Sequence, residues 1–312
     1  MHDGLTISLF DLMTEFPSED AARLWLEQMR WNKGHRVCPY CGADTHQHNQ
    51  HRGGKAGYYR CNHCKKVYTV RTGTIFERSH IGFRKWLLGM YYILTARKGV
   101  SSLQLSKHLD IIQKSAWYML QRIRTAMGND GSIILSGIVE IDEAYIGGKE
   151  SNKHESRKLK EGRGPVGKTA VIGIKERNGK TVAKVVESAD KVTAEGMIEE
   201  HVSENATVNT DESAIYNGVS KKRKHTKVNH SAKVFVDGMA STNGIESVWS
   251  VLKRMFYGTY HQFSKKHLQR YVDECTFRLN EGKCKNPVWN RMECLVRGCF
   301  DRQTTYKMLV AA

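Results

Sequence analysis

Three polar side chains recur at helical spacing in residues 243–256. Asn243, Glu246 and Lys253 fall on one flank of a helix that turns by about 100° per residue. The other flank is an apolar stripe made of Ile245, Val248, Trp249, Leu252 and Phe256. Ser241 or Thr242 is expected to supply the N-cap oxygen. An amide, a carboxylate and an ammonium beside a core-facing stripe indicate a functional site, although a solvated amphipathic helix would carry the same residues.

Two aspartates lie in predicted strands. Asp142 belongs to an alternating apolar and acidic strand over residues 136–148, and Asp211 ends a strand over residues 206–211. Between them we expect a hairpin that turns at Asn178 and Gly179 and a helix capped by Thr193. Three strands, a helix, a strand and then the helix of residues 243–256 are the element order of an α/β RNase H-like domain with a mixed sheet.

In that fold the strands of Asp142 and Asp211 are neighbours, so their carboxylates are expected to meet at one edge of the sheet. Glu246 would join them from its helix. Three carboxylates at one place hold two Mg²⁺ or Mn²⁺ ions for phosphoryl transfer on DNA, and Lys253 would contact a DNA phosphate. Taken singly, either aspartate has an ordinary alternative role as a strand-end or turn-forming residue.

Two further acids flank Asp142. In an extended strand Glu140 shares the face of Asp142 and is a candidate neighbouring acid. Glu143 is expected to point to the other face, and we interpret it as a bystander.

Four cysteines near the N-terminus have the spacing C-x2-C-x19-C-x2-C. Cys38, Cys41, Cys61 and Cys64 therefore predict one structural, four-thiolate Zn²⁺ site in a zinc ribbon, and a redox pair is disfavoured. Basic residues around the ribbon are expected to contact DNA, namely Arg60, Lys65 and Lys66.

Residues 83–127 have helical periodicity, and the last two helices have the form of a helix-turn-helix. If this region binds DNA, the second helix enters the major groove with Lys114, Arg122 and Arg124. A helical hairpin inside a larger core would give a similar pattern, and the sequence leaves both open.

The charge balance favours a polyanionic partner. The chain of 312 residues has 49 Lys and Arg against 32 Asp and Glu, a formal net charge of +17. Its apolar runs are too short to span a membrane, and the first residues do not resemble a signal peptide. A soluble, cytoplasmic protein is expected.

Composition and pattern together predict a multidomain chain. The expected parts are an N-terminal helical segment (1–35), the zinc ribbon (36–76), a helical, helix-turn-helix-like region (77–130), the RNase H-like catalytic domain (131–285) and a C-terminal tail (286–312).

The chain resembles the IS1595/ISXO2-like family of bacterial insertion-sequence transposases over nearly its whole length. The motifs that carry the resemblance are CPYCG, YRCNHC, TGTIFERSHIGFRKW, VEIDEAYIGGKE, VNTDES, STNGIESVWSVLKRMFYGTYH and HLQRYVDE. The resemblance implies DNA cleavage and strand transfer at the inverted-repeat ends of an element. It also implies at least a homodimer on DNA and a nucleoid-associated location.

The family's DD(E/N)K site falls on Asp142 and Asp211 for the aspartates and on Lys253 for the lysine. Its third ligand is Glu in some members and Asn in others. We favour Glu246, because it adds a third negative charge, and assign Asn243 an auxiliary role. Two alternatives remain: a zinc-ribbon DNA-binding protein whose RNase H-like domain is inactive, and a nuclease that cuts without strand transfer.

Overall fold

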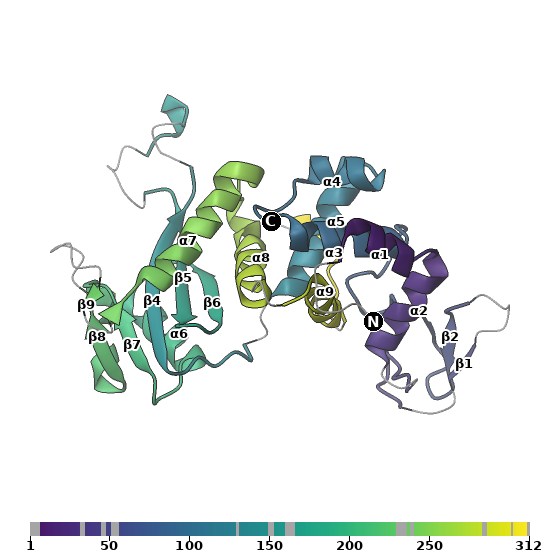
Figure 1. Ribbon diagram of the computed structural model, residues 1–312, viewed down its shortest axis with the longest axis horizontal. Helices are drawn as coiled ribbons and strands as arrows, with labels where there is room; N and C mark the ends of the chain where they lie inside the picture. Colours follow the sequence, from purple (N-terminus) through teal and green to yellow (C-terminus); the bar gives the residue numbers. More distant parts are fainter. Residues whose placement is uncertain are drawn as a thin grey trace. The chain divides into compact units, whose positions relative to one another are not determined.

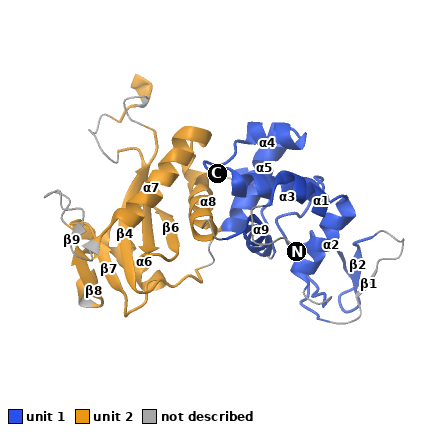
Figure 2. Ribbon diagram, viewed as in Figure 1, with its two compact units in different colours: residues 1–127, 284–312 blue, residues 128–283 orange. Residues whose placement is uncertain are grey.

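The computed structural model describes residues 7–31, 35–44, 48–50, 56–128, 131–148, 153–159, 166–228, 236–237, 240–282, 286–300 and 302–310. The chain forms two compact units, which Figure 2 colours separately. The first unit combines residues 1–127 with residues 284–312, and the second holds residues 128–283. The chain therefore completes the second unit before it returns to the first.

The first unit begins with helices α1 (Leu9–Glu15) and α2 (Glu19–Arg30), whose N-termini are capped by the hydroxyls of Ser8 and Ser18. Three short antiparallel strands follow in the order β1 (His48–Gln50), β2 (Tyr59–Cys61) and β3 (Val67–Tyr68). Trp31 packs against the rings of Tyr59 and Tyr68, and the Tyr59 hydroxyl donates to Glu27 on α2 at 2.7 Å. Aromatic packing thus joins the small sheet to α2.

Helices α3 (Phe83–Thr95), α4 (Ser102–Leu109) and α5 (Gln113–Met127) complete the first unit together with α9 (Val288–Arg297) and α10 (Tyr306–Val310). Ser101 caps α4 as expected. Asp110 ends α4 in the left-handed conformation, with φ at 47°, and this tight turn lets α5 pack back on α4. The predicted pair of helices with a short link is therefore present.

In the described part of the second unit, five strands form one mixed sheet in the order β6-β5-β4-β7-β8. They are β4 (Ile138–Ile146), β5 (Thr169–Glu176), β6 (Thr181–Val186), β7 (Thr207–Thr210) and β8 (Lys224–Lys227). The pairs β4–β5 and β5–β6 are antiparallel, whereas β4–β7 and β7–β8 are parallel. A second, two-stranded sheet pairs β9 (Val236–Asp237) with β10 (Ala240–Ser241).

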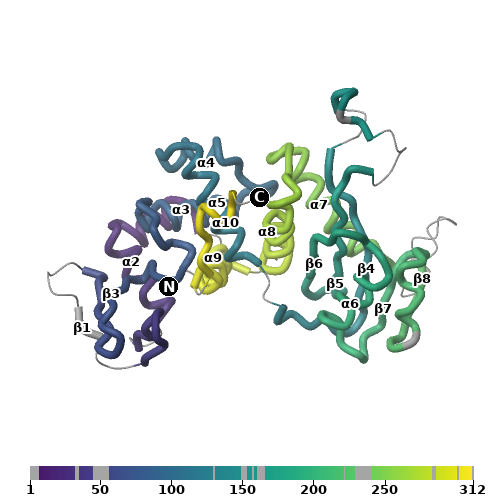
Figure 3. The backbone as a smooth tube through the Cα atoms, turned by 180° about the vertical axis from the view of Figure 1, so that it is seen from behind, coloured from purple at the N-terminus to yellow at the C-terminus, as the bar shows by residue number. Residues whose placement is uncertain are grey.

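Helices cover both faces of the five-stranded sheet. Helix α6 (Lys191–His201) packs on one face, where Val139 and Ile141 of β4 are buried. Helices α7 (Asn243–Met255) and α8 (Leu268–Glu281) pack on the other face, where Ala144 and Ile146 are buried. Figure 1 shows α7 running alongside β4, and Figure 3 shows the same unit from behind. This arrangement is the RNase H-like fold that the element order predicted.

Two helix caps differ from the expectation. Helix α6 begins after Asp190, whose carboxylate accepts from the Thr193 N–H at 2.9 Å, so Asp190 rather than Thr193 is the cap. Thr242 occupies the N-cap position of α7, but its hydroxyl caps no backbone N–H and instead donates to Glu246 at 3.3 Å.

The predicted hairpin turn is confirmed, with Asn178 at φ 61°. Within the described residues, no helix combines the length and apolarity that a membrane crossing requires.

Candidate active site

The four cysteines of the C-x2-C motifs meet at one point. The sulfur atoms of Cys38, Cys41, Cys61 and Cys64 all lie within 4.8 Å of one another, with Cys38 to Cys64 at 3.6 Å and Cys41 to Cys61 at 3.8 Å. Burial opposes ionisation of Cys61, but the backbone N–H groups of Cys64 and His63 outweigh it and lower the pKa of its thiol to about 7. Four sulfur atoms that converge on one point suit a tetrahedral Zn²⁺ site.

The basic residues predicted around the ribbon are exposed. Arg60, Lys65 and Lys66 all present their side chains to solvent, and the Lys66 ammonium lies 4.9 Å from the centre of the Tyr40 ring. Tyr40 is itself half exposed. Exposed cations beside an aromatic ring are compatible with contact to DNA, which remains a prediction for these residues.

Two of the three cations predicted to contact DNA from α5 are buried. Arg122 and Arg124 are 2% and 1% exposed. The Arg122 guanidinium lies over the rings of Trp86 and Tyr118 and donates to the Glu77 carbonyl at 2.5 Å. Their assignment as DNA contacts is therefore wrong, because side chains enclosed in the core cannot reach a phosphate. Lys114, in the first turn of α5, is exposed.

The strands that carry the two aspartates are neighbours, as expected. Strands β4 and β7 are parallel, and their last paired residues are Glu140 and Asn209. Asp142 and Asp211 each lie two residues further along, so they extend from the same end of adjacent strands. The Asp211 carboxylate also accepts from the Ser213 N–H at 3.0 Å, which forms the turn after β7.

Helix α7 brings a carboxylate and an ammonium to the same place. Asp142, Glu246 and Lys253 line one cavity of about 580 Å³. Its other lining residues are Glu143, Ala144, Tyr145, Lys168, Trp249 and Ser250. Neither Asp211 nor Asn243 is among them, and Asn243 is exposed at the first turn of α7. Of the two candidates for the third ligand, Glu246 therefore has the cavity position. No motif singles out Lys168, which precedes β5.

Two hydrogen bonds tie α7 to β4. The Glu140 carboxylate accepts from the Ile245 N–H at 3.0 Å, and the Asp142 carboxylate accepts from the Trp249 indole N–H at 2.9 Å. From Glu140 to Asp142 the strand rises by about 6.8 Å, and from Ile245 to Trp249 the helix rises by about 6 Å. The two acids are therefore spaced along β4 as their two donors are spaced along α7. The two contacts fix the position of α7 along β4, and with it the position of Glu246.

Glu140 acts as the helix cap that Thr242 does not provide. Its side chain is buried, and its second oxygen accepts from Arg177 at 3.2 Å. A Cβ on Gly244 would lie 2.5 Å from the Glu140 carboxylate, so only glycine permits this approach. The negative charge of Glu140 at the N-terminus of α7 also interacts favourably with the positive end of the helix dipole. Glu140 therefore has a structural role on the face of Asp142.

Glu143 lines the cavity, and its interpretation as a bystander stays a prediction. Its carboxylate accepts from the hydroxyl of the buried Tyr216 at 2.8 Å. Tyr216 belongs to the core on the α6 face, which agrees with the predicted alternation along β4. Burial and the charge of Asp211 raise the pKa of Glu143, although the Tyr216 hydrogen bond counteracts them. The sequence could not show that this carboxylate stays near the strand end.

Comparisons with known proteins match two regions of the chain to transposase domains. A family model described as the ISXO2-like transposase domain matches residues 134–280, and a transposase zinc-ribbon domain matches residues 17–67. Residues 134–280 are an ISXO2-like transposase domain. The chain is also 29% identical over 273 residues to an uncharacterized protein in transposable element ISH50 of Halobacterium salinarum, across 82% of this chain and 89% of that protein. The zinc-ribbon match begins at residue 17, two residues before α2, and ends at residue 67.

The acids of the transposase domain suit hard divalent cations. Burial, and next the charge of Glu143, raise the pKa of the Asp142 carboxyl to about 7, and Asp211 adds to the effect. Mutual repulsion of this kind is relieved when a cation is shared between carboxylate oxygens. Among the described residues, the four thiolates are the possible metal ligands within 4.8 Å of one another, and the carboxylates are not gathered so closely. The type of donor, though not the spacing of these carboxylates, fits Mg²⁺ or Mn²⁺.

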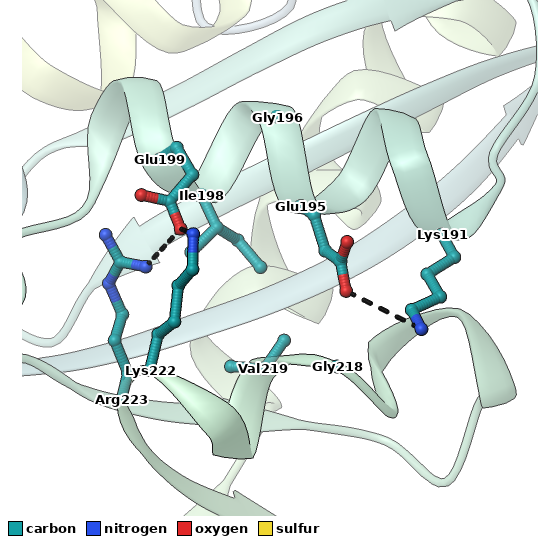
Figure 4. A pocket seen from close by; sticks show the side chains of 9 residues that line it. All are labelled: Lys191, Glu195, Gly196, Ile198, Glu199, Gly218, Val219, Lys222 and Arg223. Carbon is teal, nitrogen blue, oxygen red and sulfur yellow. Dashed lines mark hydrogen bonds and ion pairs between the residues drawn. The ribbon is translucent and has the colours of Figure 1, made fainter.

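A second cavity of the transposase domain differs in its electrostatics. It has a volume of about 370 Å³ and lies between α6 and the short helical turn Val219–Lys221 (Figure 4). Its charged residues pair within the cavity: Lys191 with Glu195, and both Lys222 and Arg223 with Glu199. Charges that are already engaged in ion pairs offer little to a phosphate or a metal, so the cavity of Asp142 is the candidate active site.

Proposed function

We propose that this protein cleaves DNA at the inverted-repeat ends of an insertion sequence and joins the freed 3′ ends to target DNA. The observation that carries the proposal is the convergence of Asp142, Glu246 and Lys253 on one cavity, beside Asp211 on the neighbouring strand. The transposase domain and the transposase zinc-ribbon domain support it.

The chemistry is an exchange of phosphodiester bonds. In cleavage, water attacks the phosphorus atom, the bond from phosphorus to the 3′ oxygen breaks, and the oxygen leaves as a 3′-hydroxyl. In joining, that hydroxyl attacks a phosphorus atom of the target, one phosphodiester replaces another, and the target's own 3′ oxygen leaves with a proton. No external energy source is needed, because the bond formed is of the same kind as the bond broken.

The side chains of the cavity divide these tasks. The exposed ammonium of Lys253 and the half-buried Lys168 can hold phosphate oxygens at the cavity wall. Asp142, Asp211 and Glu246 would hold two Mg²⁺ or Mn²⁺ ions, which when bound supply activation of the attacking oxygen and stabilisation of the leaving oxygen. The net charge of +17 favours association of the chain with DNA.

Purified protein and labelled DNA from the borders of its own gene test the proposal. With Mg²⁺ we expect cleavage at the border of the element and transfer of the labelled 3′ end to a plasmid. Asp142→Asn should abolish both reactions while binding to the labelled end stays near the level of the unchanged protein. A product that is nicked but never joined would identify a nuclease, and binding without any cleavage would identify an inactive domain.

The third ligand is tested by a matched pair. Glu246→Gln removes the carboxylate that lines the cavity, and Asn243→Ala changes a residue one turn earlier on the same helix. We expect Glu246→Gln to reduce cleavage by about 10³-fold, because a ligand charge is lost at the reacting centre. Asn243→Ala should have a smaller effect. The reverse ranking would assign the third ligand to Asn243.

A further inference from the structure

We infer that Trp249 is a positioning residue of the active site, which holds the Asp142 carboxylate in one orientation through its indole N–H. The inference rests on the proposed function in one respect, that Asp142 is a metal ligand. The hydrogen bond is 2.9 Å long and runs from Nε1 of Trp249 to Oδ2 of Asp142. The residues lie on α7 and on the central strand β4.

The indole ring of Trp249 packs against a glycine of the neighbouring strand, β5. Gly173 on β5 is the register partner of Asp142, so the two residues lie side by side across β4 and β5. A Cβ on Gly173 would lie 2.5 Å from Cη2 of Trp249. The ring therefore occupies the space that a side chain at position 173 would need, and any larger residue there would displace it.

Packing leaves the indole little freedom. Trp249 is 4% exposed and belongs to the core formed by α7, α8 and the sheet. A buried indole N–H requires an acceptor, and here that acceptor is a carboxylate lining the active-site cavity. A ring held by the core thus determines where Oδ2 of Asp142 lies.

The same helix carries Glu246, one turn before Trp249. The N–H of Trp249 therefore links the orientation of Asp142 to the element that positions Glu246. Groups that orient metal ligands by hydrogen bonds typically change metal affinity by about 10- to 100-fold when they are removed. A tryptophan that served only as core filling would affect stability but not metal affinity.

Mn²⁺ binding to zinc-loaded protein without DNA tests this inference. Electron paramagnetic resonance of free Mn²⁺ gives the affinity of the unchanged protein, of Trp249→Phe and of Asp142→Asn. We expect Asp142→Asn to abolish tight binding and Trp249→Phe to weaken it about 10-fold, because phenylalanine keeps an aromatic ring but has no N–H donor. The Mg²⁺ concentration for half-maximal cleavage should rise by a similar factor, with end binding unchanged.

The outcomes separate the two proposals. If Asp142→Asn abolishes Mn²⁺ binding but Trp249→Phe leaves it unchanged, the positioning role is overturned and the proposed function stands. If Asp142→Asn leaves Mn²⁺ binding unchanged, the metal site itself is wrong. Phe256→Leu is the matched control, since Phe256 is buried in the same core and follows α7 directly. It should lower stability without changing Mn²⁺ affinity.

A second replacement serves if Trp249→Phe does not fold. Benzothienylalanine at position 249 has nearly the shape of tryptophan, with sulfur in place of the N–H group. We expect it to retain the melting temperature of the unchanged protein in EDTA and still to show the loss of Mn²⁺ affinity. Full Mn²⁺ affinity in this folded variant would overturn the inference.

Discussion

The carboxylate of Glu140 accepts a hydrogen bond from the Ile245 N–H at 3.0 Å, across 105 residues of sequence. One buried acid of β4 thus caps α7, the helix that brings Glu246 and Lys253 to the cavity of Asp142. One face of β4 therefore carries a structural acid, Glu140, and a candidate catalytic acid, Asp142.

Glu140→Ala is expected to lower the free energy of unfolding by about 2–4 kcal/mol. It leaves the Ile245 N–H without its acceptor and Arg177 without its ion-pair partner. Glu140→Gln should cost less, because its amide oxygen still accepts from Ile245. Urea unfolding followed by circular dichroism measures both variants. Equal stability of Glu140→Ala and the unchanged protein would contradict the capping role.

Glu143→Gln is expected to raise the Mn²⁺ concentration for half-maximal cleavage by about 3- to 10-fold, because one negative charge is removed from the cavity of Asp142. Tyr216→Phe should have a smaller effect, since it removes only the donor to Glu143. Glu212→Gln is the control, as Glu212 is exposed after β7. An unchanged metal requirement in Glu143→Gln would support the interpretation of Glu143 as a bystander.

Metal-free protein should lose stability as the pH rises from about 4 to about 7. The Asp142 carboxyl has a pKa of about 7 when folded, against its usual value of about 4 in unfolded chains. Folded protein therefore holds a proton in this window that unfolded protein has lost, and the charged form is disfavoured above it. In EDTA at pH 8, Asp142→Asn should be more stable by about 1–3 kcal/mol. Thermal melts in EDTA at pH 5 and pH 8 would show a larger gain at pH 8 than at pH 5. A variant less stable at both values would contradict this prediction.

Arg122 and Lys114 should separate stability from DNA binding. Arg122→Ala removes a buried guanidinium from between Trp86 and Tyr118, so it should destabilise the protein by about 2–4 kcal/mol. Lys114→Ala changes an exposed ammonium and should leave the melting temperature nearly unchanged. If this first turn of α5 contacts DNA, the variant also weakens end binding and lowers its salt dependence by about one counterion. Unchanged binding with unchanged stability would exclude Lys114 from the interface.

Removal of zinc should affect DNA binding more than chemistry. Cys61→Ser breaks the group of four thiolates in the first unit, while the cavity of Asp142 lies in the second. We expect binding to the element end to weaken more than cleavage of a short, pre-nicked substrate. Zinc content and both activities, measured on the same preparation, check this. Equal losses in both assays would argue that the ribbon is required by the catalytic unit.

Local patterns in the sequence were sufficient to predict many features of this protein. Cysteine spacing predicted the group of four thiols, because two tight C-x2-C turns bring their sulfurs to one point. The order of strands and helices predicted that β4 and β7 are neighbours, and helical periodicity predicted the apolar stripe of α7. Each of these features depends on contacts between residues close in sequence, or on a topology with few alternatives.

Tertiary structure decided which partner each side chain meets. Arg122 and Lys114 belong to one helix and have the same charge, yet only packing shows that one is enclosed and the other exposed. Trp249 has the spacing of a core residue, and only the glycine across from Asp142 lets its ring reach a carboxylate. Glu143 points to the face that alternation predicts, but the length of its side chain and the Tyr216 hydroxyl keep its carboxylate beside the cavity. Such contacts join residues far apart in the chain, so the pattern of any single segment does not contain them.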